Sequence, residues 1–242
     1  MKSKSVMKNS FLTRLRNPLL IAAAVIGTAL TSCNDNSEIE TDQLIYNIVT
    51  VKTAGTSGMT FTFRTGETTP LLTLTSTMAY NQAFGFKEGQ RVLIGYTIPT
   101  GSSAEESGPI DILNYRLVYN DTIRTATPNI VSSYLAAEMS NAQIWRTGNY
   151  LNAYAEIPVT TPAVNLCLYA DPESIKDGEV DMYLTLDNRN VSPSQRAGCY
   201  ASYPITSFLN KHPDVHTFKV HVAGAFNQSK VDFNNVYFLP GE

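Results

Sequence analysis

From residue 44 onward, short hydrophobic runs alternate with polar turns, a pattern that is typical of an all-β protein. The runs are rich in β-branched and aromatic residues, often at every second position. In the first half of the chain we expect strands at 45–51, 59–63, 69–74, 89–98 and 110–118. Five short strands in about 75 residues predict a small closed barrel.

The fourth of these runs, 89–98, carries the clearest alternation. We expect its apolar residues to share one buried face: Val92, Ile94, Tyr96 and Ile98. Gly95 interrupts the run, and a glycine inside a strand usually marks a bulge or a sharp bend. Such bends occur at the corners of small barrels.

A second block of strands follows a break in the pattern at 120–141. That break contains Pro128 and a short piece, 130–139, that could form one or two helical turns, so we interpret it as a connector between domains. Beyond it we expect strands at 144–145, 150–157, 164–169, 180–186, 199–203, 216–222 and 231–238. Turn signals at short intervals predict an antiparallel β-sandwich over 142–242 after a barrel over 44–119.

The first 32 residues have the three parts of an export signal. A basic stretch precedes an apolar run at 19–30, and the run ends in the lipobox Leu30-Thr31-Ser32-Cys33. A transmembrane helix is the alternative, but it needs roughly 20 apolar residues. We therefore expect cleavage of 1–32 between Ser32 and Cys33, attachment of lipid, including palmitate-type acyl chains, to Cys33, and anchoring to a membrane through that lipid.

Removal of the signal would leave an acidic chain. Five of the 18 basic residues and none of the 21 acidic residues lie in 1–32, so the remainder carries 13 minus 21, or −8. Phosphate binding depends on clustered Lys and Arg, and so we expect no nucleic-acid partner. The polar segment 33–43 has too little apolar surface to fold and is expected to be a tether.

The motifs together resemble the NigD-like lipoproteins of the Bacteroidetes. The lipobox, the run 89–98, Ile144-Trp145 and the turn and strand 148–152 carry this resemblance. It implies an N-terminal OB-like barrel, a C-terminal β-sandwich and a role such as the bacteriocin immunity proposed for the namesake. It supplies no catalytic or ligand-binding residue.

The acidic tether also resembles the mark that sends Bacteroidetes lipoproteins to the outer face of the outer membrane. A plain solvated spacer explains it equally well. We expect an outer-membrane lipoprotein on the periplasmic or the cell-surface face.

Two cysteines remain after Cys33. In an exported protein Cys167 and Cys199 could form a disulfide, which would stabilise the fold by about 3–4 kcal/mol. The alternative is two separate thiols that pack in strands as small hydrophobic groups.

Two clusters could hold metals, and each has a simpler explanation. All three histidines lie in 211–221, but on a strand His216 and His221 would point to opposite faces, so we expect no zinc site. The acidic loop 171–178 has Ile175 and Lys176 where an EF-hand needs an oxygen ligand and glycine, so we interpret it as a hairpin loop.

No nucleophile elbow, zinc-protease motif or phosphate-binding loop is present in the sequence. We therefore expect a protein without enzymatic activity, catalytic residue or cofactor. The best candidate ligand surface is one face of the strand from residue 150, which carries Tyr150, Asn152, Tyr154 and Glu156. Tyrosines beside amide and carboxylate groups could bind a glycan or a protein outside the cell or in the periplasm. The alternatives are an ordinary solvated face and a face covered by the barrel.

Asp121-Thr122-Ile123 resembles the short O-glycosylation signal of exported Bacteroidetes proteins. Thr122 is the candidate acceptor residue.

Overall fold

The computed structural model describes residues 44–64, 69–78, 85–99, 106–134, 139–188, 195–223 and 230–237, all within a unit that spans Thr41–Glu242. The predicted signal peptide, its cleavage site at Ser32 and Cys33, and the tether to residue 43 lie outside the described residues. Among the described residues, no helix has both the length and the apolar character needed to cross a membrane.

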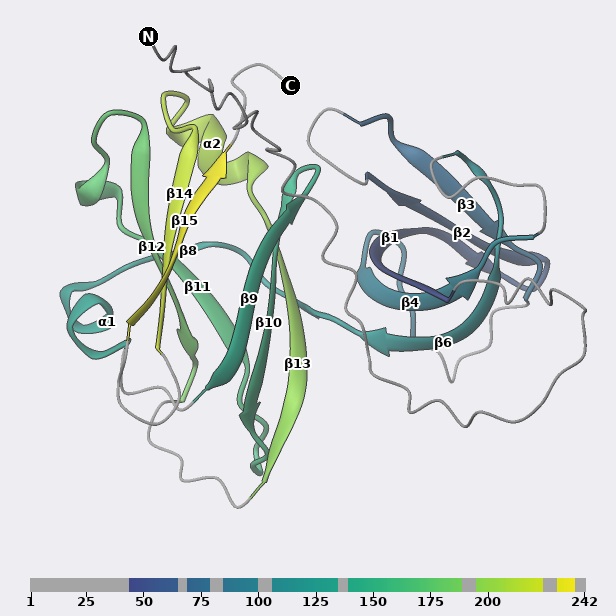
Figure 1. Cartoon of the computed structure of the whole chain (residues 1–242), viewed down its shortest axis with the longest axis horizontal. Coiled ribbons are helices and arrows are strands. Elements are labelled where there is room, and N and C mark those ends of the chain that lie inside the picture. Colours follow the sequence, from purple (N-terminus) through teal and green to yellow (C-terminus); the bar gives the residue numbers. More distant parts are fainter. Residues whose placement is uncertain are drawn as a thin grey trace, which may run out of the picture. The chain divides into compact units, whose positions relative to one another are not determined.

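The first half of the described chain forms one curled sheet (Figure 1). Its strands are β1 (Ile45–Gly55), β2 (Gly58–Phe63), β3 (Leu72–Ser76), β4 (Arg91–Thr97), β5 (Gly108–Pro109) and β6 (Asp111–Leu117). They lie in the order β5-β3-β2-β1-β4-β6. Only Ile110 separates β5 from β6, so one continuous segment pairs with β3 at one edge and with β4 at the other. The sheet is curled in an OB-like way, but among the described residues its hydrogen-bonded order ends at β5 and β6, so the closed barrel expected from the sequence is not found.

The predicted buried face of β4 is confirmed. Val92, Ile94 and Tyr96 lie in the core of the curled sheet with Val49, Phe61 and other apolar residues from β1 to β3, and Ile98 packs against that core. The predicted irregularity at Gly95 is also confirmed, because the register between β4 and β6 shifts between Gly95 and Tyr96.

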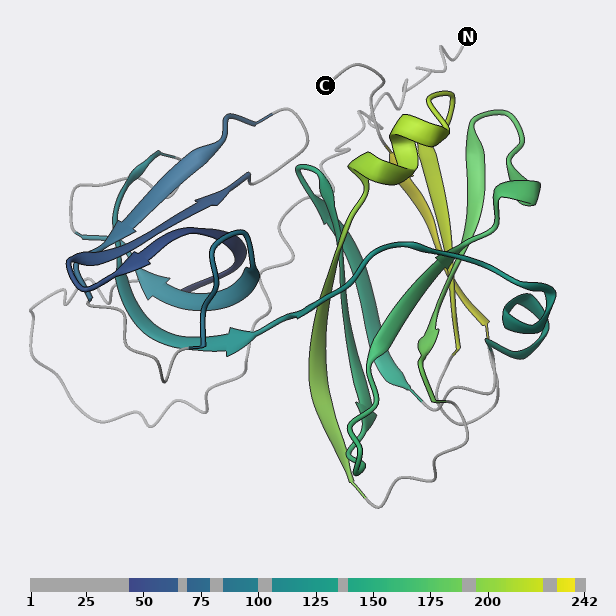
Figure 2. The ribbon, with the colours of Figure 1, turned by 180° about the vertical axis from the view of Figure 1, so that it is seen from behind.

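The second half forms two further sheets, seen from both sides in Figures 1 and 2. One has the order β7-β13-β10-β9 and the other β15-β14-β12-β11-β8. The bounds are β7 (Tyr119–Asn120), β8 (Arg124–Thr125), β9 (Ser140–Thr147), β10 (Tyr150–Pro158), β11 (Leu166–Ala170), β12 (Glu179–Leu186), β13 (Arg196–Pro204), β14 (Thr217–Ala223) and β15 (Lys230–Tyr237). The described residues of this half also form the helices α1 (Pro128–Ser133), η3 (a 3-10 helix, Pro172–Ser174) and α2 (Thr206–Lys211).

One apolar core joins these two sheets, as expected of a sandwich. Alternation along β10 and β12 predicts the inward residues correctly. The core includes Leu151, Ala153, Ala155 and Ile157 of β10 and Val180, Met182, Leu184 and Leu186 of β12.

The sandwich differs from the expected purely antiparallel form. β12 pairs with β14 in parallel, because β13 of the other sheet and α2 intervene between them along the chain. The predicted connector also takes part in the sandwich. β7 pairs in parallel with β13 of one sheet, and β8 pairs in parallel with β11 of the other.

Candidate functional site

An extensive buried polar network centres on Arg91, the first residue of β4. Its side chain is directed to the outer face of the curled sheet, and the residue is only 2% exposed. The guanidinium donates hydrogen bonds to Thr50 Oγ1 (3.1 Å), Thr147 Oγ1 (2.8 Å), Ser202 Oγ (3.3 Å) and Asn152 Oδ1 (3.4 Å). The network therefore links β1 and β4 with β9, β10 and β13.

The backbone of Arg91 is held as well. Its N–H donates to Asn120 Oδ1 (2.9 Å), and Asn120 Nδ2 donates to the Arg91 carbonyl (3.2 Å). Asn120 belongs to β7, which pairs with β13. One asparagine thus joins the start of β4 to the edge of the sandwich.

Arg91 carries a buried positive charge. Among the described residues, no carboxylate forms an ion pair with it. Burial lowers the pKa of Arg91 to about 10, and Tyr150 partly offsets this effect. The Tyr150 ring lies 4.4 Å from the guanidinium carbon and adds a cation–π contact. Hydroxyl, amide and ring groups therefore stabilise the charge, and the arrangement can fix five strands in one geometry.

The predicted ligand face of β10 is divided by this network. Asn152 is fully buried, donates to Thr147 Oγ1 (2.8 Å) and accepts from Ser202 Oγ (2.9 Å). The expectation that all four residues share an open surface is therefore wrong for Asn152. Tyr150 faces Arg91, so this half of the face matches the alternative of a face covered by the barrel.

The other half of that face remains partly open. Tyr154 and Glu156 are intermediate in exposure. The Tyr154 ring lies 4.8 Å from the Tyr200 ring, and Glu156 accepts a hydrogen bond from Ser140 Oγ (3.0 Å). Burial raises the pKa of Tyr154, with Glu156 and Tyr200 adding to the rise and Arg116 opposing it. Arg116 of β6 therefore lies within electrostatic range of this surface.

Cys167 and Cys199 are free thiols in this structure, so the disulfide is not formed. Cys167 is fully buried in β11, and Cys199 packs at the edge of the sandwich core from β13. Burial raises the pKa of the Cys167 thiol from 9.0 to about 11 and also raises that of Cys199. Both residues match the alternative of separate packed thiols.

The three histidines have different partners. His212 contacts the Phe208 ring (4.7 Å), and His216 Nδ1 lies 3.1 Å from Thr217 Oγ1. His221 Nε2 lies 2.8 Å from Asp181 Oδ1, and its ring stacks on Tyr183. Among the described residues, no group of three or more His, Cys, Asp or Glu side chains could hold a metal ion.

The acidic loop 171–178 is structural. Asp171 Oδ1 caps η3 by accepting from Glu173 N–H (3.1 Å), and Lys176 and Glu179 close a turn through Asp177 and Gly178, both with positive φ. Thr122 is exposed between β7 and β8, and its N–H donates to Asp121 Oδ1 (2.8 Å). Its glycosylation stays a prediction.

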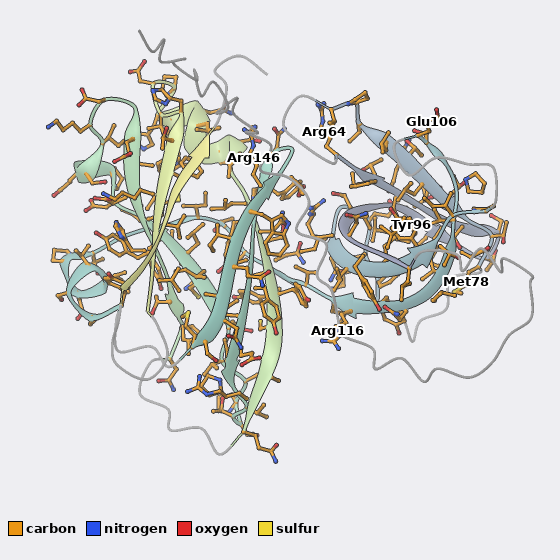
Figure 3. The ribbon with its side chains drawn as sticks, in the orientation of Figure 1. Arg64, Met78, Tyr96, Glu106, Arg116 and Arg146 are labelled. Atoms are coloured by element: carbon orange, nitrogen blue, oxygen red, sulfur yellow. The ribbon has the colours of Figure 1, made fainter. Side chains whose placement is uncertain are left out.

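A surface that the alternation of apolar residues did not reveal lies on the outside of β1, β4 and β6. Cross-strand pairing there forms the rows Tyr46–Gly95–Asn114, Ile48–Leu93–Arg116 and Thr50–Arg91. The middle row is largely covered, because Ile48 and Leu93 are buried with Val118, Trp145 and Tyr200. The first row is open: Tyr46 is 49% exposed and Asn114 is exposed. Figure 3 shows the contrast between Tyr96, inside the curled sheet, and Arg116, which projects from β6 outside it.

Comparison with known proteins shows which solved structures have a similar fold. No protein-family model and no curated protein matches the sequence. A solved NigD-like immunity protein from Bacteroides caccae superposes with a TM-score of 0.53 and 17% identity, over 78% of this chain and 91% of that one. The chain has the NigD-like fold. The resemblance seen in the sequence is confirmed at that level.

Two other solved structures are similar in fold to this chain. A protein of unknown function from Bacteroides vulgatus has a TM-score of 0.60 and 20% identity, and covers 82% of this chain and 93% of that one. A candidate lipoprotein from Bacteroides fragilis has a TM-score of 0.55 and 15% identity, and covers 83% of this chain and 100% of that one.

Proposed function

We propose that this chain is a lipid-anchored protein of the outer membrane whose β units form a non-enzymatic binding module. The observation that carries the proposal is the lipobox ending at Cys33, in front of a fold that matches the full length of a candidate lipoprotein. The structure adds support for a binding role. The groups of the buried Arg91 network bond to one another and hold strands together, while aromatic and amide side chains such as Tyr46 and Asn114 remain open on the outer surface.

The anchor is tested with a Cys33→Ala variant of the full chain. We expect the wild type to incorporate radiolabelled palmitate and to sediment with outer membranes, and the variant to do neither. A Cys199→Ala variant, which also loses one thiol, is the matched control and should behave as the wild type. Sedimentation of Cys33→Ala with membranes would contradict the anchor.

A second function is favoured by the likeness to an immunity protein. In this alternative the module neutralises a secreted antibacterial protein. Deletion of the gene should then make cells hypersensitive to a bacteriocin made by neighbouring strains, and the intact gene should restore resistance. Unchanged sensitivity of the deletion strain would count against immunity and leave the general binding role.

A further inference from the structure

The open row on the outer face of the curled sheet holds an aromatic ring in a fixed position. Tyr46 lies on β1 opposite Gly95 of β4, and its hydroxyl accepts a hydrogen bond from Asn114 Nδ2 of β6 (3.1 Å). A Cβ atom at Gly95 would lie 2.6 Å from Tyr46 Cε1 and would also clash with the Asn114 amide. Gly95 has no positive φ, so the glycine leaves space for the ring and does not serve an unusual backbone conformation.

This arrangement makes Tyr46 a preorganised platform. The Tyr46 ring lies close to Gly95, and the residue keeps about half of its surface exposed. Because the hydroxyl is already held by Asn114, a ligand that stacks on the ring orders few additional rotamers. Asn114 donates one of its two N–H groups to Tyr46, so its other amide groups can serve a ligand.

Polar groups continue from this platform toward the open half of the β10 face. Arg116 follows Asn114 on the same face of β6 and is exposed. Its charge also reaches Tyr154, as the opposing effect on the pKa of that phenol indicates. The platform is thus bordered by an amide and a guanidinium, and Tyr154 adds a second partly open ring.

We infer that Tyr46, Asn114 and Arg116 bind a neutral oligosaccharide built from pyranose units. The C–H face of a pyranose ring stacks on a flat aromatic ring, and its hydroxyl groups bond to the flanking amide and guanidinium. The net charge of −8 beyond residue 32 disfavours polyanionic glycans. A purely apolar peptide would leave Asn114 and Arg116 without partners. The inference rests on the proposed binding role and is independent of the lipid anchor.

The test uses the full-length chain purified in detergent. Saturation-transfer NMR and calorimetry would measure binding of maltohexaose, cellohexaose, xylohexaose and mannohexaose, with a chondroitin sulfate hexasaccharide as the anionic probe. The variants are Tyr46→Ala, Tyr46→Phe and Asn114→Ala. Leu71→Ala, which removes another exposed side chain (56%) beside the same sheet, is the matched control. Circular dichroism verifies that each variant is folded, and the exposed Asn114 supplies a second test if Tyr46→Ala does not fold.

We expect at least one neutral hexasaccharide to bind, and the anionic one not to bind. Tyr46→Ala should weaken binding about tenfold or more, Tyr46→Phe should stay within about threefold because the ring remains, and Leu71→Ala should match the wild type. The inference would be overturned if no neutral probe bound to the wild type. It would also be overturned if Tyr46→Ala and Asn114→Ala both bound the probe as tightly as the wild type does. Neither result affects the palmitate and sedimentation assay at Cys33. The lipid anchor and the oligosaccharide site are therefore tested by independent experiments.

Discussion

At the scale of single residues, two buried tyrosines show how differently the fold treats a polar atom. Tyr96 and Tyr203 are at most 1% exposed. The Tyr96 hydroxyl accepts a hydrogen bond from Asn47 Nδ2 (2.9 Å), whereas the Tyr203 hydroxyl has no partner among the described residues. A buried hydroxyl without a partner destabilises the folded state by its lost hydration.

This contrast gives a matched pair of substitutions. Tyr203→Phe should leave the free energy of unfolding unchanged or raise it by about 1 kcal/mol, because only an unpaired hydroxyl is removed. Tyr96→Phe should lower it by about 1 kcal/mol, because a hydrogen bond is lost. Urea unfolding followed by circular dichroism measures both values. Equal destabilisation by the two changes would show that the Tyr203 hydroxyl is bonded.

The buried thiol of Cys167 makes stability depend on alkaline pH. Its pKa in the folded chain, about 11, exceeds the ordinary 9.0, so the folded state keeps the proton longer than the unfolded state. The protonated Cys167 thiol stabilises the folded state fully below pH 9. This stabilisation is lost as the pH rises toward 11, which lowers the free energy of unfolding by roughly 2 kcal/mol. Unfolding midpoints at pH 7, 9 and 10.5 should fall less steeply for Cys167→Ala than for the wild type. Parallel slopes for the two proteins would contradict the assignment.

At the scale of elements, alternation in the sequence predicts strands well where one face is buried. The inward residues of β4, β10 and β12 follow directly from their period of two. It fails for β7 and β8, because strands of two residues show no period, and these short strands pair with both sheets of the sandwich. The same reasoning places Asn152 on an open face, since alternation shows which residues share a face but not what covers it.

The turn between β1 and β2 offers a test at this scale. Gly55 and Gly58 are paired across it, but only Gly58 has a positive φ (138°), and a Cβ there would lie 2.5 Å from the Ser76 carbonyl oxygen. Gly58→Ala should lower the free energy of unfolding by about 1–3 kcal/mol. Gly55→Ala, which has open space, should change it by less than about 0.5 kcal/mol. Similar urea midpoints for the two variants would argue against this geometry.

At the scale of the whole molecule, Arg91 joins strands that are up to 111 positions apart in sequence. Its role could not be predicted, because it stands at the start of a hydrophobic run and its partners are ordinary hydroxyl and amide residues. The open Tyr46 row was missed for a related reason. Gly95 was interpreted through the bend that it permits, whereas the structure shows that it also makes room for a ring.

The network predicts that Arg91 cannot be replaced by another cation. A lysine keeps the charge, but its single nitrogen cannot occupy the three separate positions from which the guanidinium nitrogens donate to Thr50, Thr147 and Ser202. Arg91→Lys should lower the free energy of unfolding by about 2–3 kcal/mol, and Arg116→Lys, an exposed arginine on the same outer face, by less than about 0.5 kcal/mol. Calorimetric unfolding of both variants provides the comparison. If Arg91→Lys unfolds as the wild type does, the fork geometry is not needed.

The start of β1 at Ile45 has a consequence for any chain held by lipid at Cys33. The twelve peptide units from 33 to 45 span at most about 40 Å, so the Tyr46 platform stays within that distance of the attachment point. A ligand fixed to the same cell surface would share this thin layer, where effective concentrations reach the millimolar range. A stacking contact of modest affinity would hold a ligand longer there than in solution. Clustering of several anchored copies on one polysaccharide would strengthen attachment further without any new contact.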